Sequence, residues 1–549
     1  MADFKKSVVY QIYPKSFYDS NGDGLGDLRG VIEKLDYIKE LGVDYIWMTP
    51  FFVSPQKDNG YDVEDYYNID PRYGTMEDVE ELSREAEKRG IRLMFDMVFN
   101  HTSDRNQWFQ KALAGDPKYK DFYIFKKGPK PGVPPTNWES KFGGSAWEYV
   151  EKFDEYYLHL FDVSQPDLNW ENPEVRKEVQ NVIKFWMGKG IKGFRFDVVN
   201  LISKDKYEND YEGDGRRFYT DGPNIHKYLR ELNEATFGTD AEIITVGEMS
   251  STTMENCYQY ANEDGKELSM VFSFHHLKVD FMGNEKWVIV PFDFQKLKKI
   301  LFDWQVNMGK HHAWNAVFWC NHDQPRVVSR FGNVEKYWKE SAKMLGTVIH
   351  CLRGTPYIYQ GEELGMTNAG FTDISQYKDV ESLNHFRILQ EKGLTEENAY
   401  QILQIHSRDN SRTPMQWNSG ENGGFTTGEP WIEVNKNCSY INAEAELQDE
   451  DSIFHYYQKL IALRKEYDVI AYGELKPLDE KNPSVFAYER EYQGEKMLVI
   501  CNFYGKEVTW DSETELGEYQ CVLSNYEVHN IEGSRIGLKP YEAVVLYKK

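Results

Sequence analysis

Cysteine is scarce in this sequence, and long apolar runs are missing. Six cysteines are spread over 549 residues without a Cys-x-x-Cys pair, which is typical of reduced thiols in a cytoplasm rather than of a disulfide framework. No run of about 18 apolar residues occurs, so we expect no transmembrane helix. No small-residue cleavage site follows the first lysines, and we therefore expect a cytoplasmic protein without a secretory signal.

Positive charge is also scarce relative to negative charge. The chain has 64 Lys and Arg against 89 Asp and Glu, which gives a formal net charge of -25. This excess argues against general binding to nucleic acid or to an anionic membrane, although it permits a local basic pocket. Hydrophobic residues make up 40% of the chain and aromatic residues 15%, so we exclude bulk disorder and expect a large buried core.

Short β-rich runs alternate with helical patterns along much of the chain. In residues 28–41 apolar side chains recur at steps of three and four before Gly42, which predicts one helix. Eight strand candidates in this order predict an α/β fold with a parallel (β/α)8 TIM barrel. The candidates are 8–13, 45–48, 92–99, 193–198, 242–246, 270–274, 316–320 and 356–359.

Two regions depart from this alternation. Residues 102–171 are rich in Pro, Gly, Trp and Tyr, and they predict a small inserted domain after the third strand. In residues 473–549 apolar and polar side chains alternate, which predicts a C-terminal antiparallel β-sandwich domain. We therefore assign residues 1–101 and 172–472 to the catalytic barrel.

Charged side chains close several of the predicted strands, where the active site of a parallel barrel lies. Arg195 and Asp197 share one face of the fourth strand, and the arginine favours the ionised carboxylate that a nucleophile needs. Glu248 closes the fifth strand, whose apolar residues favour a carboxyl that keeps its proton. His322 and Asp323 close the seventh strand.

These groups suit glycoside hydrolysis, which needs an attacking carboxylate, a proton donor and groups that hold ring hydroxyls. His101, at the end of the third strand, is a further polar candidate. Each residue alone has a plainer explanation, because an Asp after a strand commonly caps a helix and an Arg–Asp pair can be structural. Their coincidence at successive strand ends favours the catalytic interpretation.

Four segments resemble the short motifs of the α-amylase superfamily of glycoside hydrolases (family 13). They are 96–101, 193–197, 246–248 and 321–323. The resemblance implies a retaining double-displacement mechanism, with Asp197 as the nucleophile and Glu248 as the general acid/base. Asp323 would bind sugar hydroxyls and stabilise the oxocarbenium-like transition state. The residues implied to hold the −1 sugar are His101, Arg195 and His322.

Two further segments, 58–62 and 412–417, resemble the exo-acting α-glucosidase branch of this superfamily. The resemblance implies that Asp58 and Arg412 pair and bind the terminal 4- and 6-hydroxyls. Tyr61 would stack on the sugar, although core packing is the plainer interpretation of a tyrosine taken alone.

Residues 19–27 place oxygen donors at alternate positions, as a hard-cation loop does, with Gly24 at its sixth position. The twelfth position is Gly30, so the bidentate Glu of an EF-hand is missing. A polar turn is the alternative, but together with the family resemblance we expect a structural Ca2+ site, or one for Mg2+, and no organic cofactor. The ligands would be Asp19, Asn21, Asp23, Asp27 and the carbonyl of Leu25.

Three segments indicate which α-glucoside is the substrate. Residues 212–223, 246–253 and 272–280 resemble trehalose-6-phosphate hydrolases more than oligo-1,6-glucosidases. The resemblance implies cleavage of trehalose 6-phosphate into glucose and glucose 6-phosphate, with the phosphorylated sugar at +1. A phosphate dianion entering an acidic protein needs local cations. The candidate cations, which solvated surface charge would equally explain, are Lys278, Lys286, Arg216 and Arg217.

Two alternatives remain open. One is an oligo-1,6-glucosidase that acts on isomaltose-like α-1,6-glucosides. The other is a non-catalytic interaction protein similar to transporter heavy chains, which the retained Asp197, Glu248 and Asp323 disfavour. We expect a phosphorylated disaccharide as the partner, no nucleic acid or membrane, and a monomer.

Overall fold

A closed barrel of parallel strands forms the centre of the computed structural model, which describes residues 3–283, 285–527 and 530–549. The barrel strands are β1 (Val9–Ile12), β2 (Tyr45–Met48), β5 (Arg92–Met97), β9 (Gly193–Phe196), β10 (Ile244–Glu248), β11 (Met270–Phe272), β12 (Ala316–Val317) and β13 (Thr355–Tyr359). In the described ranges they form one eight-stranded sheet with the order β11-β10-β9-β5-β2-β1-β13-β12. A parallel bridge between Val271 and Asn315 joins its two ends and closes the barrel. The predicted (β/α)8 fold is confirmed.

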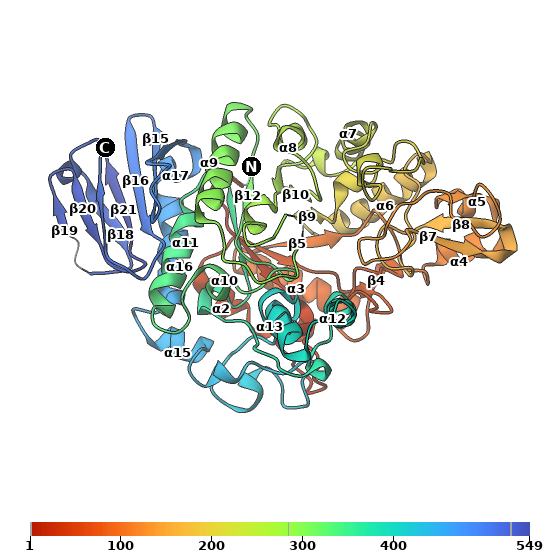
Figure 1. The fold of residues 1–549 in the computed structure, drawn as a ribbon, viewed down its shortest axis with the longest axis horizontal. Coiled ribbons are helices and arrows are strands. Elements are labelled where there is room, and N and C mark those ends of the chain that lie inside the picture. Colours follow the sequence, from red (N-terminus) through yellow and green to blue (C-terminus); the bar gives the residue numbers. More distant parts are fainter. Residues whose placement is uncertain (1–2, 284, 528–529) are drawn as a thin grey trace.

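Helices follow the strands and surround the barrel (Figure 1). They are α1 (Leu28–Glu33), α2 (Leu35–Leu41), α3 (Met76–Lys88), α6 (Pro173–Gly188), α7 (Ile225–Ala235), α8 (Met254–Tyr260), α9 (Phe294–Lys310), α10 (Val327–Phe331), α11 (Trp338–His350), α12 (Val380–Glu391), α13 (Glu396–His406), α14 (Asp409–Arg412), α15 (Ala443–Gln448), α16 (Ile453–Glu466) and α17 (Asp468–Tyr472). The single helix predicted over 28–41 is two helices, because the Lys34 amide bonds to the carbonyl of Val31, three residues back, and interrupts the α-helical ladder. Across the described residues we find no helix with the length and apolar character needed to cross a membrane.

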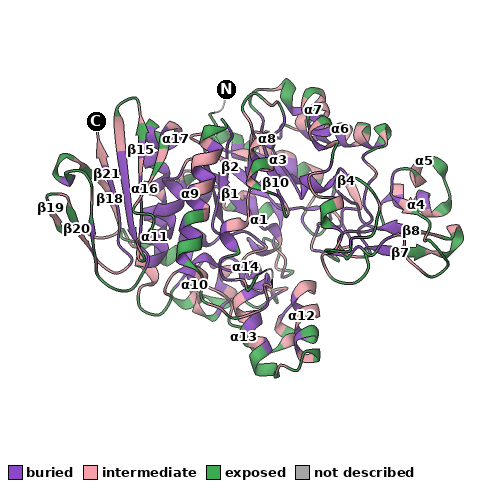
Figure 2. Ribbon diagram, turned by 45° about the horizontal axis from the view of Figure 1, so that its top comes forward, coloured by how far each residue is buried: buried purple, intermediate pink, exposed green. Residues whose placement is uncertain are grey.

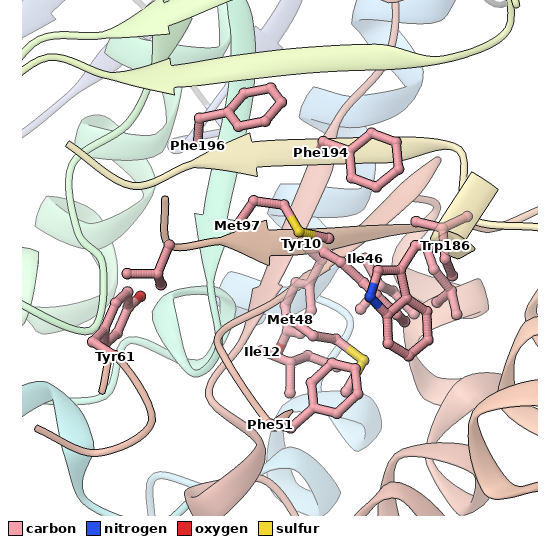
Figure 3. Packing of buried hydrophobic residues seen from close by; sticks show 14 of the residues in the cluster. Tyr10, Ile12, Ile46, Met48, Phe51, Tyr61, Met97, Trp186, Phe194 and Phe196 are labelled. Carbon is pink, nitrogen blue, oxygen red and sulfur yellow. The ribbon is translucent and has the colours of Figure 1, made fainter. Parts of the chain in front are cut away.

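Strand β9 shows how a barrel strand divides its side chains between two faces. Phe194 and Phe196 belong to a buried apolar cluster that also contains Trp186 of α6 (Figure 3). Arg195, between the two phenylalanines, points to the opposite face, where it bonds to Asp96 and Asp197. This two-residue period places polar groups inside the barrel while the outer face packs against helices. The barrel strands are buried along most of their length (Figure 2).

A small unit projects from the barrel after β5, on the right of Figure 1. It contains α4 (Gln107–Ala114), α5 (Pro117–Lys120), β6 (Phe125–Lys126), β7 (Trp147–Val150) and β8 (Glu155–Leu158). Its strands form an antiparallel sheet with the order β6-β8-β7, and an antiparallel bridge between His101 and Asp167 closes its base. A two-stranded ribbon of β3 (Phe52–Val53) and β4 (Asp65–Ile69) lies in the loop after β2.

The C-terminal part of the chain forms two antiparallel sheets, on the left of Figure 1. One has the order β14-β15-β16-β21-β18, from Glu474–Leu478, Val485–Tyr492, Glu495–Asn502, Ala543–Lys548 and Gln520–Ser524. The other has the order β17-β20-β19, from Val508–Asp511, Arg535–Leu538 and Asn530–Glu532. Apolar residues of both sheets share one buried cluster, as in a sandwich. The domain limits given above stay predictions, and residues 1–2, 284 and 528–529 inside them lie outside the described ranges.

Candidate active site

A pocket of about 280 Å³ opens at the carboxyl ends of the barrel strands. Most of the predicted catalytic and substrate-binding residues meet there: Asp58, Tyr61, His101, Asp197, Glu248, Lys286 and Asp323 line it. Arg195, His322 and Arg412 are buried and contact lining carboxylates rather than the pocket itself. The strand ends therefore bring together residues that are up to 222 positions apart in the chain, from His101 to Asp323.

One guanidinium group holds the carboxyls at the ends of β9 and β10. Arg195 Nη1 donates to Asp96 Oδ1 and to Asp197 Oδ1, each at 2.7 Å, and Nη2 donates to Glu248 Oε2. Because Asp197 and Glu248 bond to neighbouring nitrogens of the same group, their carboxyls flank each other. Retaining glycosidases need such closeness, with about 5 Å between the two carboxyl groups.

Glu248 has the environment of a proton donor. Burial raises its pKa to about 8, and the nearby Asp197 and Asp323 carboxylates raise it as well, against the lowering effect of Arg195. Glu248 therefore keeps its proton at neutral pH, as a general acid requires. Burial likewise raises the pKa of Asp96, beneath the pocket, to about 7.

Asp323 has the opposite environment. Burial disfavours its charge, but His322, Arg408 and Arg412 outweigh burial and hold the pKa of Asp323 well below its usual range. Arg412 Nη2 donates to Asp323 Oδ1 at 2.7 Å, and Arg408 Nη1 donates to the same oxygen at 3.3 Å. His322 Nδ1 faces the side-chain nitrogen of Gln11 at 2.9 Å, and its Nε2 lies 3.4 Å from Asp323 Oδ2. Asp323 is therefore an anion in the wall of the pocket.

The predicted ion pair between Asp58 and Arg412 is wrong. Arg408 is the arginine beside Asp58, with Nη2 at 3.6 Å from Oδ1, and Arg408 also lines the pocket. Arg412 instead donates through Nε to the carbonyl of His322 at 2.9 Å. The two arginines stand four residues apart, one helical turn, so sequence spacing alone gave no means to choose between them. Burial raises the pKa of Asp58 to about 7 despite Arg408.

The Tyr61 ring lies in the pocket wall rather than in the apolar core alone. It stacks on His322 with ring centroids 5.2 Å apart and an interplanar angle of 5°, and its hydroxyl donates to Asp96 Oδ2 at 3.0 Å. Gln165, which the sequence analysis missed, reaches the same region from the insert. Its side-chain nitrogen donates to Asp58 Oδ2 at 3.1 Å. A polar residue inside an irregular insert carried no periodic signal that would have singled it out.

Comparisons with known proteins agree with this geometry. Residues 11–473 match the family model for the α-amylase catalytic domain. The chain belongs to the α-amylase family. Residues 485–545 match the model for the α-amylase SusG C-terminal domain.

This α-amylase-family chain is a glycoside hydrolase, as are the relatives named below. It is 57% identical to trehalose-6-phosphate hydrolase of Bacillus subtilis over 99% of this chain and 97% of the relative. It is 50% identical to oligo-1,6-glucosidase of Bacillus cereus over 100% of this chain and 99% of the relative. A crystal structure of a mutant Bacillus licheniformis trehalose-6-phosphate hydrolase in complex with PNG superposes with a TM-score of 0.97, at 56% identity and with 100% of both chains covered.

Cations gather at one side of the pocket of this α-amylase-family protein. Lys141, from the insert, lines the pocket and donates to Ser250 Oγ at 3.1 Å. Burial lowers the pKa of Lys141 to about 8, and the charges of Arg216 and Lys278 lower it as well, so these three cations lie near one another. Within the described ranges neither Lys141 nor Lys278 has an acidic ion-pair partner. Lys141 was not predicted from the sequence, because it lies in the irregular insert, where no periodic pattern singles it out.

The other predicted cations are paired. Lys286 Nζ lies 2.9 Å from Glu381 Oε2, and both residues line the pocket. Arg216 pairs with Asp214 at 2.5 Å, and the exposed Arg217 lies 3.0 Å from both Asp210 and Glu212. The acidic partners neutralise part of the charge that these groups would offer a phosphate.

The oxygen donors of the predicted cation loop bond to their own backbone. Asp19 accepts from the amides of Asn21, Gly22 and Gly24. Asn21 accepts from the Asp23 amide, Asp23 from the Leu25 amide, and Asp27 from the amides of Ser20 and Gly30. Across the part of the chain that the structure describes, no group of three or more His, Cys, Asp or Glu is arranged to hold an ion. The hard oxygen donors suit Ca2+ or Mg2+ chemically, and the site stays a prediction.

Proposed function

We propose that the protein hydrolyses trehalose 6-phosphate to glucose and glucose 6-phosphate with retention of configuration. The observation that carries this proposal is the pairing of two features in one pocket. Two carboxyls share the Arg195 guanidinium, and Lys141, which has no acidic ion-pair partner among the described residues, lines the same pocket. The similarity to proteins named trehalose-6-phosphate hydrolase supports the same substrate.

The first half of the reaction forms a bond between enzyme and sugar. The Asp197 carboxylate attacks the anomeric carbon of the unmodified glucose, while Glu248 gives its proton to the departing glycosidic oxygen. Glucose 6-phosphate leaves, and a glucosyl ester remains on Asp197. Asp323, held as an anion by its arginines, lies where positive charge develops on the ring in the transition state.

The second half reverses the roles. Glu248, now a carboxylate, takes a proton from water, and the oxygen of that water displaces Asp197 from the anomeric carbon. This step releases glucose and returns Glu248 to its protonated form. Arg408, close to Asp58 and Asp323 in the pocket wall, would hold the hydroxyls at the far end of the −1 sugar.

The +1 phosphate would lie against Lys141, Lys278 and Arg216. A phosphate dianion attracts cations strongly where water is partly excluded, and each charge-assisted hydrogen bond contributes about 1.5–3 kcal/mol. Lys286 would join them through a rearrangement of its pair with Glu381. This local cluster offsets the net charge of -25, which would otherwise repel an anionic sugar.

The deciding experiment compares kcat/KM on trehalose 6-phosphate, trehalose and isomaltose. We expect trehalose 6-phosphate to be the best of the three by at least tenfold. The alternative is the activity named for the Bacillus cereus relative, an oligo-1,6-glucosidase. A higher kcat/KM on isomaltose than on trehalose 6-phosphate would refute our proposal and support this alternative. An Asp197→Asn variant that retained full activity on every substrate would refute the assigned nucleophile.

We also propose a cytoplasmic location, because a phosphorylated sugar is charged and does not cross membranes unaided. The same reasoning makes a free phosphorylated disaccharide, rather than a macromolecule, the partner of this pocket.

A further inference from the structure

Lys204 is a buried cation whose ammonium protons all have acceptors. Its side chain is 3% exposed, and Nζ lies 2.7 Å from Asp167 Oδ2. Nζ also donates to Asn100 Oδ1 and to the carbonyl of Leu201, each at 2.8 Å. The acceptors come from the base of the insert, the end of β5 and the turn after β9. Lys204 therefore joins three segments at the place where His101 and Asp167 form their backbone bridge.

This ammonium determines which way the Asn100 amide faces. An ammonium group donates hydrogen bonds and cannot accept them, so Asn100 must turn its Oδ1 toward Lys204. Its Nδ2 then faces the other way, where it donates to Asp167 Oδ2 at 3.0 Å and lies 3.3 Å from His101 Nδ1. Because the amide nitrogen is a donor, Nδ1 of His101 is the acceptor and carries no proton.

The second ring nitrogen of His101 fits the same assignment. Nε2 lies 3.1 Å from the carbonyl of Tyr61, an oxygen that only accepts, so Nε2 carries the proton. Burial lowers the pKa of His101; Asp197 and Asp167 oppose this shift, and Lys204 adds to it. The imidazole is therefore neutral at neutral pH, with a single proton whose position the neighbours fix.

We propose that Lys204 is a positioning residue, which holds His101 in the Nε2–H tautomer and so keeps a hydrogen-bond donor in the wall of the pocket. Without the ammonium, the buried Asp167 carboxyl is neutralised by a proton, which it can donate to Asn100 Oδ1 in place of the bond that it now accepts from Nδ2. The amide is then free to turn its Oδ1 toward His101 Nδ1. The opposite tautomer then becomes favourable, with Nδ1–H donating to Asn100 and Nε2 accepting from Gln165, whose side-chain nitrogen lies 3.2 Å away. In the native arrangement both of these nitrogens are donors, and Gln165 bonds to Asp58 instead.

The test reads the tautomer directly. In the full-length protein labelled with ¹⁵N-histidine, the imidazole signals of His101 are identified by their loss in His101→Gln. We expect Nε2–H in the wild type and Nδ1–H in Lys204→Met. The matched control is Lys298→Met, because Lys298 is also fully buried and donates to three backbone carbonyls, near the C-terminal domain. Lys298→Met should leave the signals of His101 unchanged.

A second variant keeps the test decisive if Lys204→Met does not fold, since that change leaves the Asp167 carboxylate buried without its cation. The double variant Lys204→Met/Asp167→Asn removes both charges. The introduced amide accepts from the Leu160 amide, as the carboxylate does, and donates to Asn100 Oδ1, which favours the turned orientation. We expect Nδ1–H in this variant as well. Nδ1–H in the wild type, or Nε2–H retained in every folded Lys204 variant, would overturn the proposal.

Kinetics provide a separate readout, which rests on the proposed function, whereas the imidazole signals do not. The −1 sugar would take the place of the Tyr61 carbonyl as the acceptor of the Nε2 proton. Loss of this donor lowers kcat/KM on α-glucosides by about tenfold. We expect this fall in both Lys204 variants and a change of less than about twofold in Lys298→Met. If the tautomer switches while kcat/KM does not, the proposal that His101 donates to the −1 sugar fails. If no α-glucoside is cleaved by the wild type, the proposed function fails and the tautomer result still stands.

Discussion

Replacement of Lys141 by methionine tests the phosphate site most sharply. Methionine keeps the length of the side chain and removes its charge. Lys141 lines the pocket and donates to a neutral hydroxyl, that of Ser250, so its charge is available to a ligand. Lys286 is a weaker test, because Glu381 already balances it at 2.9 Å.

The expected magnitude follows from these contacts. A charge-assisted hydrogen bond contributes about 1.5–3 kcal/mol, and a unit charge 4 Å away contributes about 4 kcal/mol at an effective dielectric constant of 20. Lys278 and Arg216 remain in Lys141→Met and retain part of the attraction. We therefore expect a loss of about 2 kcal/mol, which is about a 30-fold fall in kcat/KM on trehalose 6-phosphate.

The assay pairs that substrate with p-nitrophenyl α-glucoside, which carries no phosphate. On the second substrate we expect Lys141→Met to stay within about twofold of the wild type. Lys127→Met is the matched control, since it removes the same charge from an exposed position of the same insert and should change neither value. Equal losses on both substrates would refute a role in phosphate binding, and so would the absence of any loss on trehalose 6-phosphate.

The remaining predictions concern the acid, the arginine beside Asp58 and the cation loop. Because the raised pKa of Glu248 is about 8, kcat/KM should fall as the pH rises through about 8, and a fall that begins near pH 5 would contradict its role as the proton donor. Arg408→Lys should lower kcat/KM at least tenfold on phosphorylated and unphosphorylated α-glucosides alike, since lysine lacks the planar guanidinium group that can form two parallel hydrogen bonds. A loss confined to trehalose 6-phosphate would contradict the proposal that Arg408 binds the hydroxyls of the −1 sugar. Ca2+ at about 100 times its Kd should raise the free energy of unfolding by about 2.7 kcal/mol in the wild type but not in Asp23→Ala, measured by thermal melting with and without chelator. Equal stabilisation of the wild type and Asp23→Ala by Ca2+ would refute the predicted ion site in this loop.

Residues at strand ends could be predicted because a strand has a strict side-chain period. In β9 the alternation of Phe194, Arg195 and Phe196 assigns opposite faces, and parallel strands bring their carboxyl ends to the same rim. Asp197 and Glu248 could therefore be placed together from the sequence, and the structure has them on one guanidinium. The barrel and the C-terminal β domain followed from the same periodic patterns.

Residues outside those patterns depended on the tertiary structure. The choice between Arg408 and Arg412, and the arrival of Lys141 and Gln165 from the insert, are fixed by the paths of long irregular segments. The same holds for Lys204, whose three acceptors lie in separate parts of the chain. The two-residue period of a strand determines which way each of its side chains points. A loop has no such period, so the contacts of its side chains depend on the path that tertiary packing and burial impose on the loop.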